Sequence, residues 1–108
     1  MLQASEIQKR FNHLQETVSE ASRTCHADSS APKDLMNWMD ELEKECQSAM
    51  KVMATSDEER MRQCIEDLER IGDRAERACV QGNNVNESLR DTVSSMHSEL
   101  SDLKRQLH

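Results

Sequence analysis

The sequence predicts an all-α protein that folds as an antiparallel up-down-up-down four-helix bundle. Apolar residues recur at alternating steps of four and three along nearly the whole chain, which is the spacing of amphipathic helices packed against each other. Short breaks divide this pattern into four segments of similar length, and short connections favour antiparallel neighbours. The chain has 108 residues, enough for one small core. We therefore expect residues 1–108 to form a single domain, with helices over about residues 5–26, 32–54, 57–81 and 85–107.

A break that contains a proline separates the first two predicted helices. The apolar seam of the first helix consists of Ala4, Ile7, Phe11, Leu14, Val18, Ala21 and Cys25. Pro32 lacks the N–H that a helix interior requires but fits the first helical turn, so we expect it to open the second helix. The seam of that second helix consists of Leu35, Met39, Leu42, Cys46, Ala49 and Met53.

The second break follows Met53, where a continued seam would fall on polar residues and where we predict a tight helical hairpin. We assign the seam of the third helix to Met61, Cys64, Leu68, Ile71, Ala75 and Ala78. Gly82 is expected to end this helix in the left-handed conformation that glycine adopts readily. Asn84 is expected to begin the fourth helix, whose seam consists of Leu89, Val93, Met96, Leu100, Leu103 and Leu107.

Composition and charge exclude several classes of function. The formal net charge is −7, which argues against a surface for nucleic acid or anionic membranes. No apolar run approaches the length of about 18 residues that a membrane-spanning helix needs, so we expect no membrane insertion. The first residues lack the basic and apolar pattern of a signal peptide, which predicts a cytoplasmic protein.

The four cysteines have no spacing that indicates a zinc ribbon or a C-x-x-C redox motif. If the second hairpin turns near Thr55, Cys46 and Cys64 lie at the same height of the bundle, and a disulfide between them is one interpretation. Cys25 and Cys79 both fall at the opposite end of the bundle. The other interpretation is that all four are small buried hydrophobic residues, kept reduced in the cytoplasm.

The histidines and carboxylates predict neither a metal site nor catalysis. No glutamate lies three residues before a histidine, so the Glu-x-x-His pattern of di-iron bundles is absent from the sequence. His13 and His26 fall on the outer face of the first helix and His97 beside a seam, where surface histidines are the ordinary explanation. The carboxylates line helix exteriors, so we expect no catalytic residue, no metal and no cofactor.

The second helix carries more apolar residues than its seam requires. Met36, Trp38, Met50 and Val52 widen its apolar stripe into a broad face. Met-rich surfaces accept partner helices, and tryptophan is enriched at binding hot spots. We interpret these four residues as a surface for a protein partner or for a homo-oligomer. The alternative is that they complete the core.

Residues Leu35–Glu43 carry a tryptophan inside a leucine-spaced acidic stretch, and Gly82 is followed by apolar residues at Val85, Leu89 and Met96. In these features residues 33–108 resemble spectrin-type helical repeats. The resemblance implies a three-helix bundle that acts as a spacer or docking platform, without catalysis or cofactors. The first helix would then belong to a neighbouring unit or pack as a fourth member.

Together these observations predict a non-catalytic protein-interaction or scaffold module. It would bind a partner helix, or self-associate, through the broad apolar face of the second helix. The alternative is a small thiol-based regulatory or sensor protein that uses Cys46 and Cys64, or Cys25 and Cys79.

Overall fold

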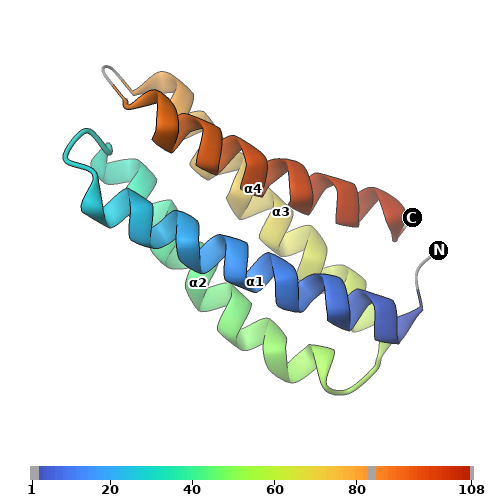
Figure 1. Ribbon diagram of the computed structural model, residues 1–108. Helices are drawn as coiled ribbons and strands as arrows, with labels where there is room; N and C mark the ends of the chain where they lie inside the picture. Colours follow the sequence, from blue (N-terminus) through green and yellow to red (C-terminus); the bar gives the residue numbers. More distant parts are fainter. Residues whose placement is uncertain (1–2, 83–84, 108) are drawn as a thin grey trace.

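The computed structural model describes residues 3–82 and 85–107 and is an antiparallel four-helix bundle, as predicted. Its helices are α1 (Ala4–Ala27), α2 (Lys33–Met53), α3 (Glu58–Gln81) and α4 (Glu87–Gln106) (Figure 1). These bounds agree with the predicted ones to within two residues. In the part of the chain that the structure describes there is no strand, and no helix is long and apolar enough to cross a membrane.

The four helices form a closed ring of neighbours. α1 packs against α2 and α4, and α3 packs against the same two helices. The bundle measures 41 × 21 × 17 Å. The α1–α2 and α3–α4 connections lie at one end, and the α2–α3 connection lies at the other (Figure 1). α1 is therefore a fourth member of one bundle rather than a helix that stands apart from a three-helix unit.

A single apolar core runs along the bundle and draws on all four helices. The buried residues of α1, α2 and α4 include nearly every predicted seam position. Ala4 is the exception, since it is only partly buried beside the core. Several buried positions hold small side chains, so the helices approach each other closely along part of their length: Ala21, Ser22, Cys25, Ala49, Gly72 and Ala75.

The predicted seam of α3 is wrong at every second position. Ile65, Gly72 and Cys79 are buried, whereas the expected Cys64, Ile71 and Ala78 are only partly buried: they pack beside the core. Both patterns follow steps of three and four and share Met61, Leu68 and Ala75, so periodicity alone cannot separate them.

The close approach of α4 explains why α3 turns Gly72 towards the core. A Cβ atom at Gly72 would lie 2.7 Å from Leu100 Cδ1, closer than normal van der Waals contact. The missing side chain therefore makes room for Leu100, which is fully buried. This role of Gly72 cannot be predicted from the spacing of apolar side chains, because glycine has no side chain.

Gly82 is also required for packing, but not in the conformation predicted from the sequence. Its φ of −69° and ψ of 141° are extended, not left-handed. A Cβ atom there would lie 2.6 Å from Pro32 Cγ and 2.7 Å from Val85 Cγ2. Glycine thus lets the two connections at this end of the bundle touch, and the Asn86 N–H donates to Ser30 Oγ across them at 3.0 Å.

Side-chain caps mark the starts of α3 and α4. Asp57 Oδ1 accepts from the Arg60 N–H at 3.2 Å, and Asn86 Oδ1 accepts from the Ser88 N–H at 3.0 Å. The predicted capping residue Asn84 lies outside the described residues. Ser56, in the α2–α3 turn, has a positive φ of 58°.

Candidate functional site

The four residues predicted to form one broad face of α2 lie along two different edges of its apolar stripe. Met36 and Met50 are two heptads apart, and so are Trp38 and Val52, so each pair shares one edge. Met50 faces a groove shared with α1, whereas Trp38 contacts α3. The core seam of α2 separates the two pairs.

On the α1 side, Met50 is the exposed member of the set, with 50% of its surface accessible. It lines an open groove of about 480 Å³ between α1 and α2, where Phe11 and Met53 also reach the lining. Gln15 Nε2 lies 3.1 Å from Met50 Sδ. A more polar groove of about 770 Å³ continues from it along α1 and α2 and shares Asn12 with it.

On the α3 side, Trp38 is partly buried and is covered by an arginine. The Arg74 Cζ atom lies 5.1 Å from the centroid of the indole ring, a cation–π geometry. Trp38, Met36 and Val52 all pack against the apolar core. The interpretation that these residues complete the core therefore fits three of the four side chains. Met50 is the one that keeps a large accessible surface.

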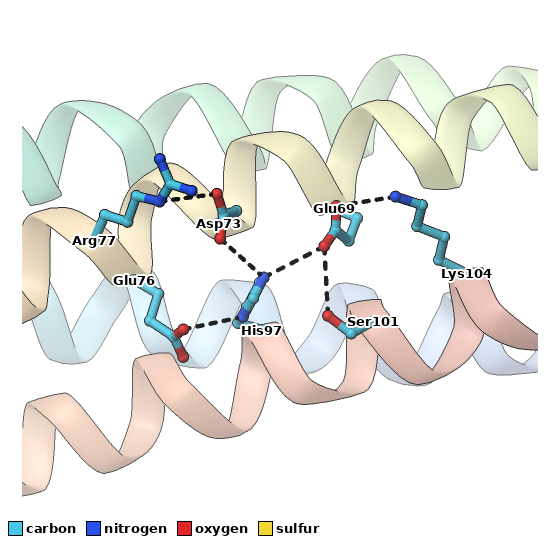
Figure 2. Close-up of polar contacts among 7 residues, drawn as sticks. All are labelled: Glu69, Asp73, Glu76, Arg77, His97, Ser101 and Lys104. Carbon is cyan, nitrogen blue, oxygen red and sulfur yellow. Dashed lines mark hydrogen bonds and ion pairs between the residues drawn. The ribbon is translucent and has the colours of Figure 1, made fainter.

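A polar cluster that the sequence did not predict lies between α3 and α4, centred on His97 (Figure 2). The His97 side chain is only 16% exposed, so the prediction of a surface histidine is wrong at this position. Three carboxylates from successive turns of α3 surround the ring: Glu69, Asp73 and Glu76.

The contacts of His97 divide between the two ring nitrogens. Nδ1 lies 3.2 Å from Glu76 Oε1, while Nε2 lies 3.5 Å from Glu69 Oε1 and 3.8 Å from Asp73 Oδ1. Nε2 is buried and makes no hydrogen bond within the described residues. The ring also passes beside Gly72, since its Cδ2 atom would lie 3.5 Å from a Cβ there.

Basic and hydroxyl side chains complete this cluster. Lys104 Nζ lies 3.5 Å from Glu69 Oε2, and Ser101 Oγ donates to Glu69 Oε1 at 3.5 Å. Arg77 Nε lies 3.2 Å from Asp73 Oδ2, as the i,i+4 spacing predicts. The carboxylates are thus occupied by partners within the protein, and the cluster joins α3 to α4 rather than presenting a reactive group to solvent.

Only part of the His97 cluster could be predicted from the sequence. Glu69, Asp73 and Glu76 follow the i, i+4, i+7 spacing of one helix edge, which is also the pattern of an ordinary solvated surface. Their meeting with His97 depends on the register between α3 and α4, which the pattern of a single helix does not give.

The four cysteines all lie within the described residues and are free thiols. Cys25, Cys46 and Cys79 are buried, and Cys64 is partly buried because it lies off the α3 seam. A disulfide between Cys46 and Cys64 stays a prediction for oxidising conditions.

Burial raises the pKa of every thiol. The pKa of Cys46 rises from 9.0 to about 12, first through loss of solvation and then through the charges of Glu43 and Glu45. The pKa of Cys25 rises to about 11 for the same first reason, with Asp40 adding to the effect. The thiolate is the reactive species, and a raised pKa lowers its population near neutral pH.

Within residues 3–82 and 85–107, no group of three histidine, cysteine, aspartate or glutamate side chains is arranged to hold a metal ion. No protein-family model matches the chain, and neither a curated protein nor a solved structure matches it. The resemblance to spectrin-type repeats accordingly stays a prediction that rests on the residues quoted for it.

Proposed function

We propose that this chain is a non-catalytic protein-interaction module that binds a helix of a partner protein along α1 and α2. The half-exposed Met50 side chain carries the proposal, because it lies over a groove that reaches Phe11 and Met53. A methionine is flexible and polarisable, so it adapts to an apolar side chain of a docking helix. The polar groove that continues from it, through Asn12, provides hydrogen-bonding groups along the rest of such a helix.

Two observations support a binding role over a catalytic one. The thiols are protonated near neutral pH, and the carboxylates around His97 are engaged by neighbouring side chains. The four free thiols also support a reducing compartment, and we place the protein in the cytoplasm.

Site-specific photocrosslinking tests the proposal. A photoreactive residue at position 50 should give a discrete crosslinked species with a second protein in a lysate of the source cells. The matched control is position 80, since Val80 is another exposed apolar residue, on α3, with 67% of its surface accessible. Excess unlabelled chain should abolish the crosslink at position 50, whereas excess Met50→Glu chain should not.

Three outcomes would contradict the proposal. Equal crosslinking at positions 50 and 80 would show that the label samples its surroundings without specificity. A crosslink only between two copies of the chain would assign the Met50 groove to a homo-oligomer. The lack of any discrete crosslinked species would remove the surface from consideration.

A further inference from the structure

Each of three successive turns of α3 carries an acid followed by an arginine, and the two kinds of side chain lie on different faces. Glu69, Asp73 and Glu76 are partly buried beside α4. The residue after each is an exposed arginine, and we call these three residues the arginine ridge: Arg70, Arg74 and Arg77. The ridge is a basic strip on a chain whose formal net charge is −7.

The arginine ridge borders a groove that holds the only tryptophan of the chain. This open groove, of about 540 Å³, lies between the start of α2 and the end of α3. Trp38, Arg74 and Arg77 line it together with Asp34, so its charged groups are two arginines and one aspartate. Locally, therefore, the sign of the charge is opposite to that of the chain as a whole.

Arg74 combines a cation–π contact with an exposed position. The contact keeps the guanidinium near the indole ring, and the exposed side chain can still donate to a further partner. A guanidinium group is planar and offers two parallel hydrogen bonds to a carboxylate, and such bidentate pairs are among the stronger polar contacts. The indole beside it supplies apolar area at low conformational cost.

The other two arginines each form an exposed ion pair. Arg77 lies 3.2 Å from Asp73 and is 73% exposed, and Arg70 lies 3.8 Å from Asp67 and is 66% exposed. Exposed ion pairs contribute little to stability, so these arginines can exchange their partner for a carboxylate of another protein at small cost. Together the three arginines offer cations over two helical turns.

We propose that the arginine ridge and Trp38 bind an acidic helix of a partner protein, with carboxylates one turn apart on Arg74 and Arg77. Charge complementarity selects this occupant, because a neutral apolar helix would leave the arginines without new partners. Asp34 also lines the groove and would repel a carboxylate placed beside it. The proposal extends the proposed function to a second surface, on the opposite edge of α2 from Met50.

A labelled peptide tests this surface on the full chain. The probe is a helical peptide of about 20 residues with glutamates one turn apart, and the reference peptide has glutamine at those positions. Fluorescence anisotropy of the label gives the affinity without relying on the Trp38 environment. We expect saturable binding of the glutamate peptide, about tenfold or more weaker binding to Arg74→Gln and Arg77→Gln, and weaker binding as salt rises.

Matched variants separate this proposal from a loss of folding and from the proposed function. Arg105→Gln removes an equally exposed arginine from α4 and should bind the peptide as the unchanged chain does. Met50→Glu should also bind normally, so the two surfaces can fail independently. Asp34→Asn should strengthen binding, because it removes the carboxylate from the groove.

Several results would overturn the proposal. Equal affinity for the glutamine peptide would show that charge does not direct binding. Equal weakening by Arg105→Gln would show a non-specific attraction. A single-stranded RNA probe that binds more tightly than the acidic peptide, with the same dependence on Arg74, would reassign the ridge to phosphate recognition.

Discussion

Between α3 and α4 the helices meet closely over Gly72 and enclose His97 with three carboxylates, whereas between α1 and α2 open grooves leave Met50 half exposed. Both regions flank the same core, and each contains both apolar and polar side chains. The difference is in what the polar groups contact. On the α3–α4 side they contact each other across two helices, and on the α1–α2 side many remain accessible in the grooves.

The presence of charge does not by itself mark a functional surface. The carboxylates of Glu69 and Glu76 contact Lys104 and the His97 ring across the two helices. The neighbouring arginines of the ridge are exposed and only weakly paired. The surfaces that we assign to partners are those where internal contacts leave side chains accessible, and four experiments test this division between enclosed and open positions.

The largest expected effect on stability concerns the buried thiol of Cys46. Its pKa is 9.0 without burial and about 12 in the fold, so the unfolded chain ionises first as pH rises. The stability that the protonated thiol provides is complete below pH 9 and is lost between pH 9 and 12, at about 1.4 kcal/mol per pH unit. The free energy of unfolding, measured with urea at several alkaline pH values, should therefore fall less per pH unit for Cys46→Ala than for the unchanged chain.

Cys64→Ala is the control for this experiment, since Cys64 is partly buried at the α2–α3 edge. Burial also raises the pKa of Cys64, so this variant should change the dependence of stability on pH in the same direction but by less. If both variants changed the slope equally, the distinction between an enclosed thiol and an edge thiol would be lost.

The second largest effect on stability is expected for a substitution at Gly72. Replacement by valine places two methyl groups against the buried Leu100 side chain, where even a single Cβ would come within 2.7 Å. Overpacking of this kind costs about 1–3 kcal/mol. We expect the urea midpoint to fall accordingly, and Leu100→Ala in the same chain to recover part of the loss. Additive losses in the double variant would contradict the close contact.

A smaller effect is expected at His97. His97→Ala removes the ring from between α3 and α4 and should lower stability by about 1 kcal/mol through lost packing and polar contacts. A double-mutant cycle with Glu76→Gln measures the contact between Nδ1 and Glu76 directly, and we expect a coupling of about 0.5 kcal/mol or more. A coupling energy of zero would mean that the two side chains do not interact in solution.

The smallest effect on stability is expected at Met50. Met50→Glu changes a half-exposed side chain outside the core seam, so the free energy of unfolding should change by no more than about 0.5 kcal/mol. Added in excess as an unlabelled competitor, the same variant should fail to abolish the crosslink formed from position 50. A large loss of stability would instead place Met50 among the residues that complete the core.

Most of the architecture could be predicted from the sequence because amphipathic helices repeat their apolar residues with a fixed period. The helix bounds followed from where that period broke, at Pro32 and after Met53. The α3 seam was mispredicted because two registers share Met61 and Leu68, and the deciding residue, Gly72, has no side chain to show its orientation.

The candidate sites were less predictable, because they depend on contacts between helices. Met36 and Trp38 were assigned to one broad face, but two residues so close in sequence lie on opposite edges of the α2 stripe. His97 was predicted to lie beside the seam of the fourth helix, as an ordinary surface histidine. Its surroundings come from α3, and no local pattern states which turn of α3 lies opposite a given turn of α4.

The contacts between α1 and α4 have a consequence for the order in which the chain folds. The helical hairpins α1–α2, α2–α3 and α3–α4 each join segments adjacent in sequence, whereas His13 and Glu99, 3.0 Å apart, are separated by 86 residues, and Arg10 contacts Gln106 across 96. Closing so long a loop is entropically unfavourable until the intervening hairpins have formed. We therefore expect the contacts between α1 and α4 to form after those of the three hairpins during folding.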